Sequence, residues 1–200
     1  HRITLSGGAT FTGGYDIGDA TALLRGNAVG PSAPPFTLFR SETSVDAAAA
    51  GDVRVGYAFA RSLSVEASFG YSRPGLTTRL SQDAEAPGVT LDAERLAQYV
   101  IDVGVLWQLP RPVIAGRMRP FVIGGAGYLR QLYSERSLVE TGRVYFAGGG
   151  LRYWLRGGDG TRRSLGVRGD LRAQWRAGGV EFAGRVRIVP IAAIYVFAEL

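Results

Sequence analysis

Ten charged side chains lie within segments that are otherwise rich in apolar residues. Some of them stand at alternate positions of one segment, and the others stand alone. The spacing is clearest at Asp52 and Arg54, and again at Arg168, Asp170 and Arg172. Side chains two residues apart lie on one face of a β-strand, so each charged run is predicted to share a face. Opposite charges that meet on such faces can form ion pairs. The full set is Asp52, Arg54, Glu66, Asp102, Arg130, Arg152, Arg168, Asp170, Arg172 and Arg176.

If these faces line the lumen of a small closed barrel, two arrangements are open. The charges can form a hydrogen-bonded ion network that plugs the interior, because isolated buried ions are costly and side chains nearly fill a small barrel. Alternatively, they line a narrow pore or form a gate of switching ion pairs. Six of the ten residues are arginines and four are acids, so such a pore would prefer anions.

Catalytic and metal chemistry have little support in this sequence. His1 is the only histidine and cysteine is absent. A Ser-His-acid triad would therefore need the first residue of the chain, and neither thiolate chemistry nor a histidine metal site is available. We predict that the protein is not an enzyme and carries no cofactor and no metal.

Acidic residues also gather in two of the predicted loops. Oxygen clusters can bind calcium, but the spacing here matches no known calcium loop such as the EF-hand. We interpret them as solvated loop charges. They are Asp16, Asp19 and Glu42 in the first loop, and Asp83, Glu85, Asp92 and Glu94 in the second.

The elements that would position these side chains are strands with strict alternation. In 3–15 the odd positions are mostly apolar and the even positions small or polar. Such a strand is long for a soluble protein and long enough to cross a bilayer at a tilt. Eight candidates are found, at about 3–15, 45–59, 62–72, 96–109, 119–131, 143–155, 164–176 and 185–197.

The faces assigned to two of these strands decide where Arg130 and several aromatic residues point. In 119–131, Phe121, Ile123 and Leu129 are assigned to the outer face, which places Arg130 inside. The strand 185–197 is apolar on both faces near its end. Its parity, that is, whether its odd or its even positions point outward, stays open. The favoured outer set is Val189, Ile191, Ala193, Tyr195 and Phe197.

Connection lengths alternate between long and short, as in a barrel with long loops on one rim. The long loops are predicted at about 16–43, 73–95, 132–142 and 177–184. We therefore expect an all-β chain with one domain, 1–200, folded as an eight-stranded antiparallel up-and-down transmembrane barrel with both termini on the short-turn rim.

Aromatic residues sit toward both ends of the predicted outer faces, whereas the middle positions are mostly aliphatic or glycine. Two such bands are typical of girdles at the two membrane interfaces. The alternative is a set of core aromatics in a soluble β-sandwich. The predicted interface aromatics are Tyr15, Tyr57, Phe59, Phe69, Tyr71, Tyr99, Trp107, Phe121, Tyr153, Trp175, Tyr195 and Phe197.

The positive charge is carried by scattered arginines. The net charge is +6, and lysine is absent. Because these arginines form no patch or helical stripe, nucleic acid is not an expected partner. Acidic lipid head groups or anionic solutes fit this distribution better. The chain begins directly in a strand, without a basic and apolar leader, as a mature exported protein would.

Four segments resemble the eight-stranded outer-membrane barrel family, the OmpA-like and OmpX-like transmembrane domains. They are GYAFARSLSVEASFGYS (56–72), RPFVIGGAGYLR (119–130), FAGGGLRYWL (146–155) and GVRGDLRAQW (166–175). The chain departs from the family at its end, Phe197-Ala198-Glu199-Leu200, where family members commonly end on an aromatic residue.

The resemblance implies a porin-like integral protein of a Gram-negative cell envelope, in the outer membrane, with periplasmic termini. Its partners would be outer-membrane lipid and lipopolysaccharide, and other envelope proteins through loops or periplasmic turns. The expected role is structural, adhesive or assembly-docking, with a plugged lumen. Two alternatives stay open: a narrow anion-preferring pore for small solutes, and a soluble lipocalin-like ligand carrier.

Overall fold

The chain folds into β-strands throughout the part that the structure describes. This computed structural model describes residues 2–25, 35–82, 88, 90–91, 95–110, 117–133, 139–158, 163–180 and 186–200. Among these residues, no helix is long and apolar enough to cross a membrane. The strands form two sheets, a closed barrel and a four-stranded extension.

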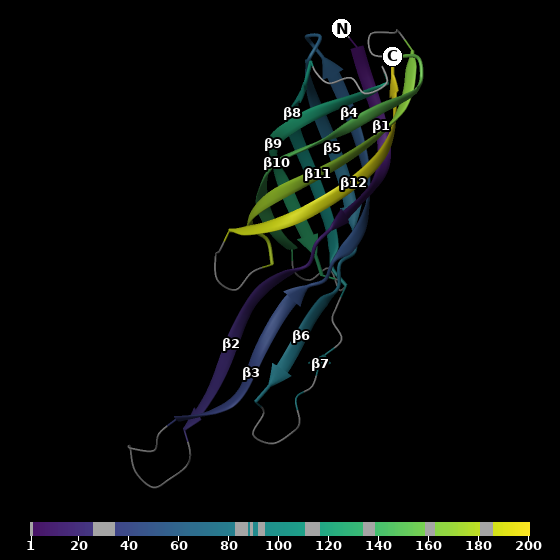
Figure 1. The fold of residues 1–200 in the computed structure, drawn as a ribbon. Helices are drawn as coiled ribbons and strands as arrows, with labels where there is room; N and C mark the ends of the chain where they lie inside the picture. The colour runs from purple at the N-terminus through teal and green to yellow at the C-terminus, as the bar shows by residue number, and fades with distance from the viewer. Residues whose placement is uncertain are drawn as a thin grey trace.

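Eight strands close into an antiparallel barrel, which confirms the predicted fold class (Figure 1). The barrel closes where the first and last strands pair, from Thr4 opposite Glu199 to Thr12 opposite Ile191. Ile3 and Leu200 extend this seam by exchanging two backbone hydrogen bonds. The strands in barrel order are β1 (Arg2–Thr12), β12 (Arg187–Glu199), β11 (Ser164–Gly178), β10 (Val139–Arg156), β9 (Met118–Leu132), β8 (Ala97–Gln108), β5 (Leu63–Ser72) and β4 (Ala48–Ala58).

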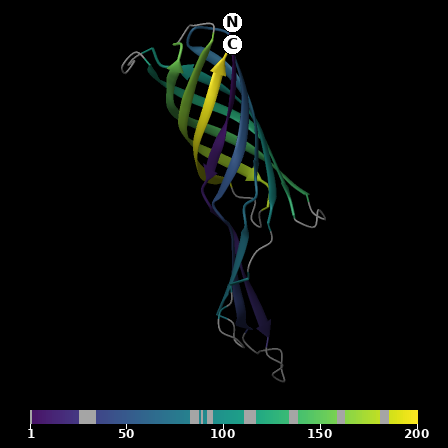
Figure 2. The same cartoon turned by 90° about the vertical axis from the view of Figure 1, so that its right-hand side faces the viewer.

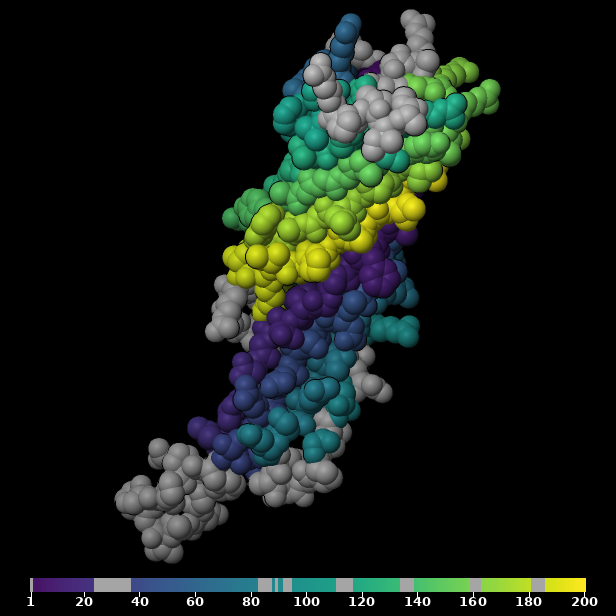
Figure 3. Space-filling view, viewed as in Figure 1, coloured from purple at the N-terminus to yellow at the C-terminus, as the bar shows by residue number. Residues whose placement is uncertain are grey.

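A second sheet projects from the end of the barrel opposite the two termini (Figures 1 and 2). Its order is β2-β3-β6-β7, with β2 at Tyr15–Arg25, β3 at Pro35–Val45, β6 at Leu76–Ser81 and β7 at Thr90–Leu91. In the space-filling view this sheet forms a narrow extension below the barrel wall (Figure 3).

The prediction that 16–43 and 73–95 are loops was therefore wrong. Both segments contain paired strands, and β3 pairs with β2 on one side and β6 on the other. β3 carries polar residues on both faces, as in Arg40-Ser41-Glu42-Thr43-Ser44. A strand without an apolar face has no period-two hydrophobic signal, so the pattern that found the barrel strands could not find this one.

The barrel has its apolar side chains outside and most of its charged side chains inside. Val53, Val55, Ile101, Val103 and Leu171 are all exposed on the outer surface. The inward positions of the barrel strands carry buried polar groups, including Asp52, Arg54, Glu66, Asp102 and Asp170. A water-soluble barrel would show the reverse distribution.

The predicted parity of β9 was wrong. Phe121, Ile123 and Leu129 are buried inside the barrel, whereas Tyr128 and Arg130 are exposed outside. Alternation failed here because this strand has apolar or small residues on both faces. The inward ring of Phe121 occupies space above Gly150 of β10, where an added Cβ would lie 2.7 Å from the ring.

The favoured parity of β12 was wrong for the same reason. Val189, Tyr195 and Phe197 are buried, whereas Ile188, Ile194 and Val196 are exposed. The inward aromatics again lie over glycines, since a Cβ at Gly8 would lie 2.7 Å from Tyr195 Cδ1 and a Cβ at Gly166 would overlap the ring of Phe197. Inside this barrel, the three inward rings of Phe121, Tyr195 and Phe197 thus pack against glycines of neighbouring strands.

Candidate functional site

The barrel lumen contains a continuous chain of buried ion pairs. It is built from β5, β10 and β11, which carry Glu66, Arg152 and the run Arg168, Asp170 and Arg172. Successive side chains of a strand point to opposite faces. These five side chains point inward, and their neighbours along each strand point toward the outer surface. Period two along the strands therefore places all five residues in one interior.

Glu66 lies at the centre of this chain. Its Oε1 accepts hydrogen bonds from Arg152 Nη2 at 2.7 Å and from Arg168 Nη1 at 2.9 Å, and its Oε2 lies 2.7 Å from Arg168 Nη1. The side chains of Glu66, Arg152 and Arg168 are only 3%, 4% and 0% exposed. One carboxylate thus neutralises parts of two buried guanidinium groups across the lumen.

Asp170 continues the chain along β11. It accepts a hydrogen bond from Arg168 Nη2 at 2.9 Å, and Arg172 donates to the same carboxylate oxygen. A separate pair forms on β4, where Arg54 Nε lies 2.8 Å from Asp52 Oδ1. These are charge-assisted hydrogen bonds in a low-dielectric interior, the strongest kind in proteins.

Aromatic rings fill the space around the guanidinium groups. Arg168 lies 4.4 Å from the ring centroid of Phe121, and Arg54 lies 4.8 Å from that of Tyr195. Both rings were predicted to face lipid. Inside the lumen they instead contribute cation–π contacts and exclude water from the ion pairs.

The network has a second anchor at the end of the barrel that holds the termini. Glu199 accepts hydrogen bonds from Ser164 Oγ at 2.7 Å and Trp154 Nε1 at 3.4 Å, and lies 3.5 Å from both Arg2 and Arg152. Sequence reasoning missed Arg2 and Glu199 because both lie just beyond the predicted strands 3–15 and 185–197, whereas the observed strands include them.

An apolar cluster covers the opposite end of the lumen, at the junction with the projecting sheet. Its buried members come from β2, β3 and two connections; they are Ile17, Val45, Leu96 and Val180. Beneath it, the fully buried Gln131 donates to Gln98 Oε1 at 2.9 Å and to Tyr15 OH at 3.3 Å. The apolar cover at this end of the barrel is thus shared by side chains of the projecting sheet and of two connections.

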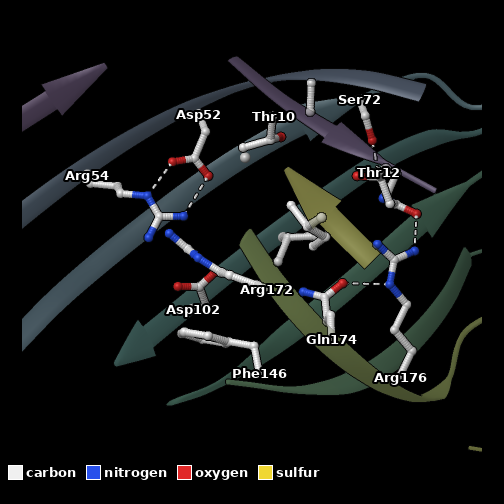
Figure 4. A pocket seen from close by; sticks show the side chains of 15 residues that line it. Thr10, Thr12, Asp52, Arg54, Ser72, Asp102, Phe146, Arg172, Gln174 and Arg176 are labelled. Carbon is white, nitrogen blue, oxygen red and sulfur yellow. Dashed lines mark hydrogen bonds and ion pairs between the residues drawn. The ribbon is translucent and has the colours of Figure 1, made fainter. Parts of the chain in front are cut away.

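Two small hollows flank the ion chain. The one nearer the projecting sheet has a volume of about 40 Å³, and Asp52, Asp102 and Arg172 point into it (Figure 4). The one nearer the termini has a volume of about 10 Å³ and is lined by Arg2, Arg152 and Glu199, among others. Volumes of this size hold at most a few water molecules.

The structure places nine of the ten predicted lumen residues inside the barrel. Arg176 is inside as well, where its Nε donates to Gln174 Oε1 at 2.7 Å. Arg130 is the exception. It is exposed on the outer surface, so its assignment to the lumen was wrong.

Eight of the twelve predicted interface aromatics lie on the outer surface, and four lie inside. Phe121, Tyr195 and Phe197 are buried, and Tyr15 points toward Gln131 and Arg176 at the covered end of the lumen. The outer eight form two groups at opposite ends of the barrel. Tyr57, Phe59, Trp107 and Tyr153 are nearer the termini, and Phe69, Tyr71, Tyr99 and Trp175 are nearer the projecting sheet.

Three of the seven acidic residues predicted in loops lie in the described part of the chain. Asp83, Glu85, Asp92 and Glu94 lie outside the described residues, as does His1. Asp19 and Glu42 share Arg40 as an ion-pair partner on the projecting sheet, at 3.3 and 3.6 Å. Within the described ranges, no three histidine, cysteine or acidic side chains are grouped to hold a metal ion.

No protein-family model matches this sequence, and no curated protein matches it. Solved structures with a similar fold are eight-stranded outer-membrane β-barrels. Neisserial surface protein A is 10% identical, with a TM-score of 0.56 over 99% of this chain and 96% of that one. The N-terminal β-barrel domain of Pseudomonas aeruginosa OprF is 12% identical, with a TM-score of 0.50 over 98% of this chain and 97% of that one. Pseudomonas aeruginosa OprG is 11% identical, with a TM-score of 0.50 over 99% of this chain and 93% of that one. The chain therefore has the fold of an eight-stranded outer-membrane barrel.

Proposed function

We propose that this protein is a non-catalytic anchor of the bacterial outer membrane, with a closed lumen and a sheet displayed at the cell surface. One observation carries the proposal: the interior is occupied by a buried ion chain, while a four-stranded sheet projects from one end. A filled lumen leaves the projecting sheet as the surface available for structural, adhesive or docking roles.

The distribution of side chains supports a membrane location over a soluble carrier. Apolar residues cover the outside of all eight barrel strands, with aromatic groups toward both ends. This is the pattern of a lipid-facing band between two interfacial girdles. A lipocalin-like carrier would need an apolar interior for its ligand, whereas this interior contains buried arginine and carboxylate groups.

The orientation follows from the placement of the projecting sheet. Outer-membrane barrels have short turns on the periplasmic side and longer segments outside the cell. The termini lie at the end opposite the sheet (Figure 1). We therefore place the termini in the periplasm and the sheet outside the cell.

The sheet gives the docking role a physical basis. β2 is an edge strand that pairs only with β3 in the described part of the chain. The free backbone groups of an edge strand can pair with an extended segment of another protein. Other envelope proteins are the proposed partners at this edge, and outer-membrane lipid and lipopolysaccharide are the proposed partners of the barrel wall.

Orientation can be tested with single cysteines, since the chain contains none. Leu23→Cys on β2 should react with a membrane-impermeant maleimide on intact cells. Phe59→Cys, at the turn near the termini, should react only after the outer membrane is permeabilised. The opposite labelling pattern would reverse the orientation, and equal labelling of both before permeabilisation would exclude a spanning barrel.

The alternative function is a narrow anion-preferring pore. The two hollows favour this candidate, because they leave space on either side of the central ion pairs and of the rings packed around them. Planar-bilayer recordings discriminate between the two functions. A closed anchor should give no stable openings, whereas reproducible anion-selective openings of the unmodified protein would establish the pore.

A further inference from the structure

Two arginines occupy the outer wall of the barrel near the projecting sheet, and apart from Arg156 at the far end of β10 the other described outward side chains of their strands are uncharged. Arg130 on β9 and Arg143 on β10 are both exposed on the outer surface. They lie near the end of the barrel that carries the projecting sheet, because Arg130 is close to the end of β9 and Arg143 to the start of β10.

The strand register makes these two arginines neighbours. Arg130 is opposite Thr141, and Arg143 is opposite Tyr128. Arg143 is therefore two residues beyond the position opposite Arg130, on the same face. Diagonal positions of this kind lie within reach of long side chains. Both guanidinium groups can therefore contact one anion between them.

Aromatic residues surround the pair at the same level of the barrel. Tyr99 of β8 is opposite Arg130, and Tyr71 of β5 is opposite Tyr99, with 5.0 Å between the two ring centroids. Arg73, just beyond Tyr71, donates a hydrogen bond to its hydroxyl group. Tyrosines on a lipid-facing wall mark the depth of the lipid head groups.

The wall offers these arginines no counter-charge. The outward positions of β5, β8, β9 and β10 contain no acidic residue among those described, and neither Arg130 nor Arg143 has an ion pair there. A cation at a lipid interface is stabilised by an anionic partner, and arginine matches phosphate with paired hydrogen bonds. Since the described outward positions of these strands supply no such anion, the two arginines are available to an anionic ligand.

Next to the pair, toward the middle of the barrel, several outward side chains of the wall are small. Gly124 of β9 is opposite Ala147 of β10, with Ala126 and Gly149 beside them. Small side chains here leave room for acyl chains to pack against the backbone. A head group held at the arginines would thus have its hydrocarbon chains next to these small side chains of the wall.

We propose that Arg130 and Arg143 bind a phosphate group of a multiply acylated glycolipid in the outer leaflet, with Tyr99 and Tyr128 packing beside its sugars. The site rests on the outer-membrane location proposed above. It does not depend on the closed lumen or on the role of the projecting sheet.

The test uses the full chain in phosphatidylcholine nanodiscs, titrated with fluorescent phosphorylated lipid A. The double variant R130Q/R143Q should bind at least about tenfold more weakly, as expected when charge-assisted hydrogen bonds are lost. The matched control is R156Q, because Arg156 is an exposed arginine at the other end of β10. It should bind like the unmodified protein.

Further binding measurements identify which part of the lipid the protein recognises. Dephosphorylated lipid A should bind the unmodified protein as weakly as phosphorylated lipid A binds R130Q/R143Q, and R130K/R143K should recover part of the affinity. An unchanged affinity in R130Q/R143Q, an equal loss in R156Q, or complete competition by millimolar inorganic phosphate would overturn the proposal. Labelling from outside the cell tests the orientation separately, so failure of this site is distinguishable from failure of the proposed function.

Discussion

The barrel lumen and the projecting sheet contain the same kinds of ion pair in opposite surroundings. In the lumen, Arg168 and Glu66 are almost completely buried. On the sheet, Arg40 and Asp19 form a pair in which the side chains are 44% and 61% exposed. The lumen pair is closer, at 2.7 Å against 3.3 Å, and water screens only the pair on the sheet. Burial makes each lumen charge depend on its partner, whereas each sheet charge can be solvated alone.

The largest effect is expected from breaking the lumen network at its centre. Glu66→Gln removes the carboxylate shared by Arg152 and Arg168 and leaves buried positive charge without compensation. The free energy of unfolding should fall by about 3–5 kcal/mol. Urea titration of the protein in lipid vesicles measures it, and a loss below 1 kcal/mol would show that water enters the lumen freely.

A second comparison uses two leucines with similar exposure in different surroundings. Leu171 on the barrel wall is 69% exposed, and Leu23 on the projecting sheet is 60% exposed. Leu171→Arg should destabilise the protein by about 2–4 kcal/mol, because it places a charge in the middle of the lipid-facing wall. Leu23→Arg should change stability by no more than about 0.5 kcal/mol.

The same urea titration serves for both leucine variants. Equal small effects would mean that the barrel wall faces water. This result would remove the physical basis of the membrane location.

A smaller effect is expected where the two regions meet. Tyr15 of β2 accepts a hydrogen bond from Gln131 Nε2 inside the barrel. Tyr15→Phe removes this bond, but Gln131 keeps its bond to Gln98. The expected loss is about 0.5–1.5 kcal/mol, again from urea titration. A loss as large as that of Glu66→Gln would show that this hydrogen bond contributes as much to the free energy of unfolding as the central ion pairs.

The smallest effect is expected on the sheet itself. Arg40→Gln breaks the exposed pairs with Asp19 and Glu42 and should cost about 0.2–1 kcal/mol. The difference should shrink further when salt is raised, because exposed charges are screened. A cost that exceeds this range and does not change with salt would contradict the contrast drawn between the two regions.

The barrel strands were predictable because one face of each had to meet lipid and the other a polar lumen. β11 illustrates this: Arg168, Asp170 and Arg172 alternate with apolar or small residues, and the structure places all three inside. β9 and β12 could not be assigned in this way, since Phe121, Tyr195 and Phe197 fill the lumen although their types suit the outside equally well. The glycines opposite them, Gly150, Gly8 and Gly166, were the overlooked signal.

The strands of the projecting sheet were missed because neither of their faces needs to be apolar. β3 and β6 are held by backbone pairing and by bonds such as that between Thr43 and Thr78, at 3.2 Å. Such pairing produces no periodic pattern of apolar residues in the sequence. The partner of each strand is defined only when the barrel brings the two long connections to the same rim.

The sequence by itself determined the number of barrel strands, their approximate bounds and the lumenal position of most charged residues, because a period of two is a local property of extended chain. Only the tertiary structure decided which carboxylate meets which arginine, which rings turn inward, and that Arg130 lies outside. Those outcomes depend on the register between strands that are distant in sequence and on the space that opposite glycines leave. Both properties arise only when the barrel closes.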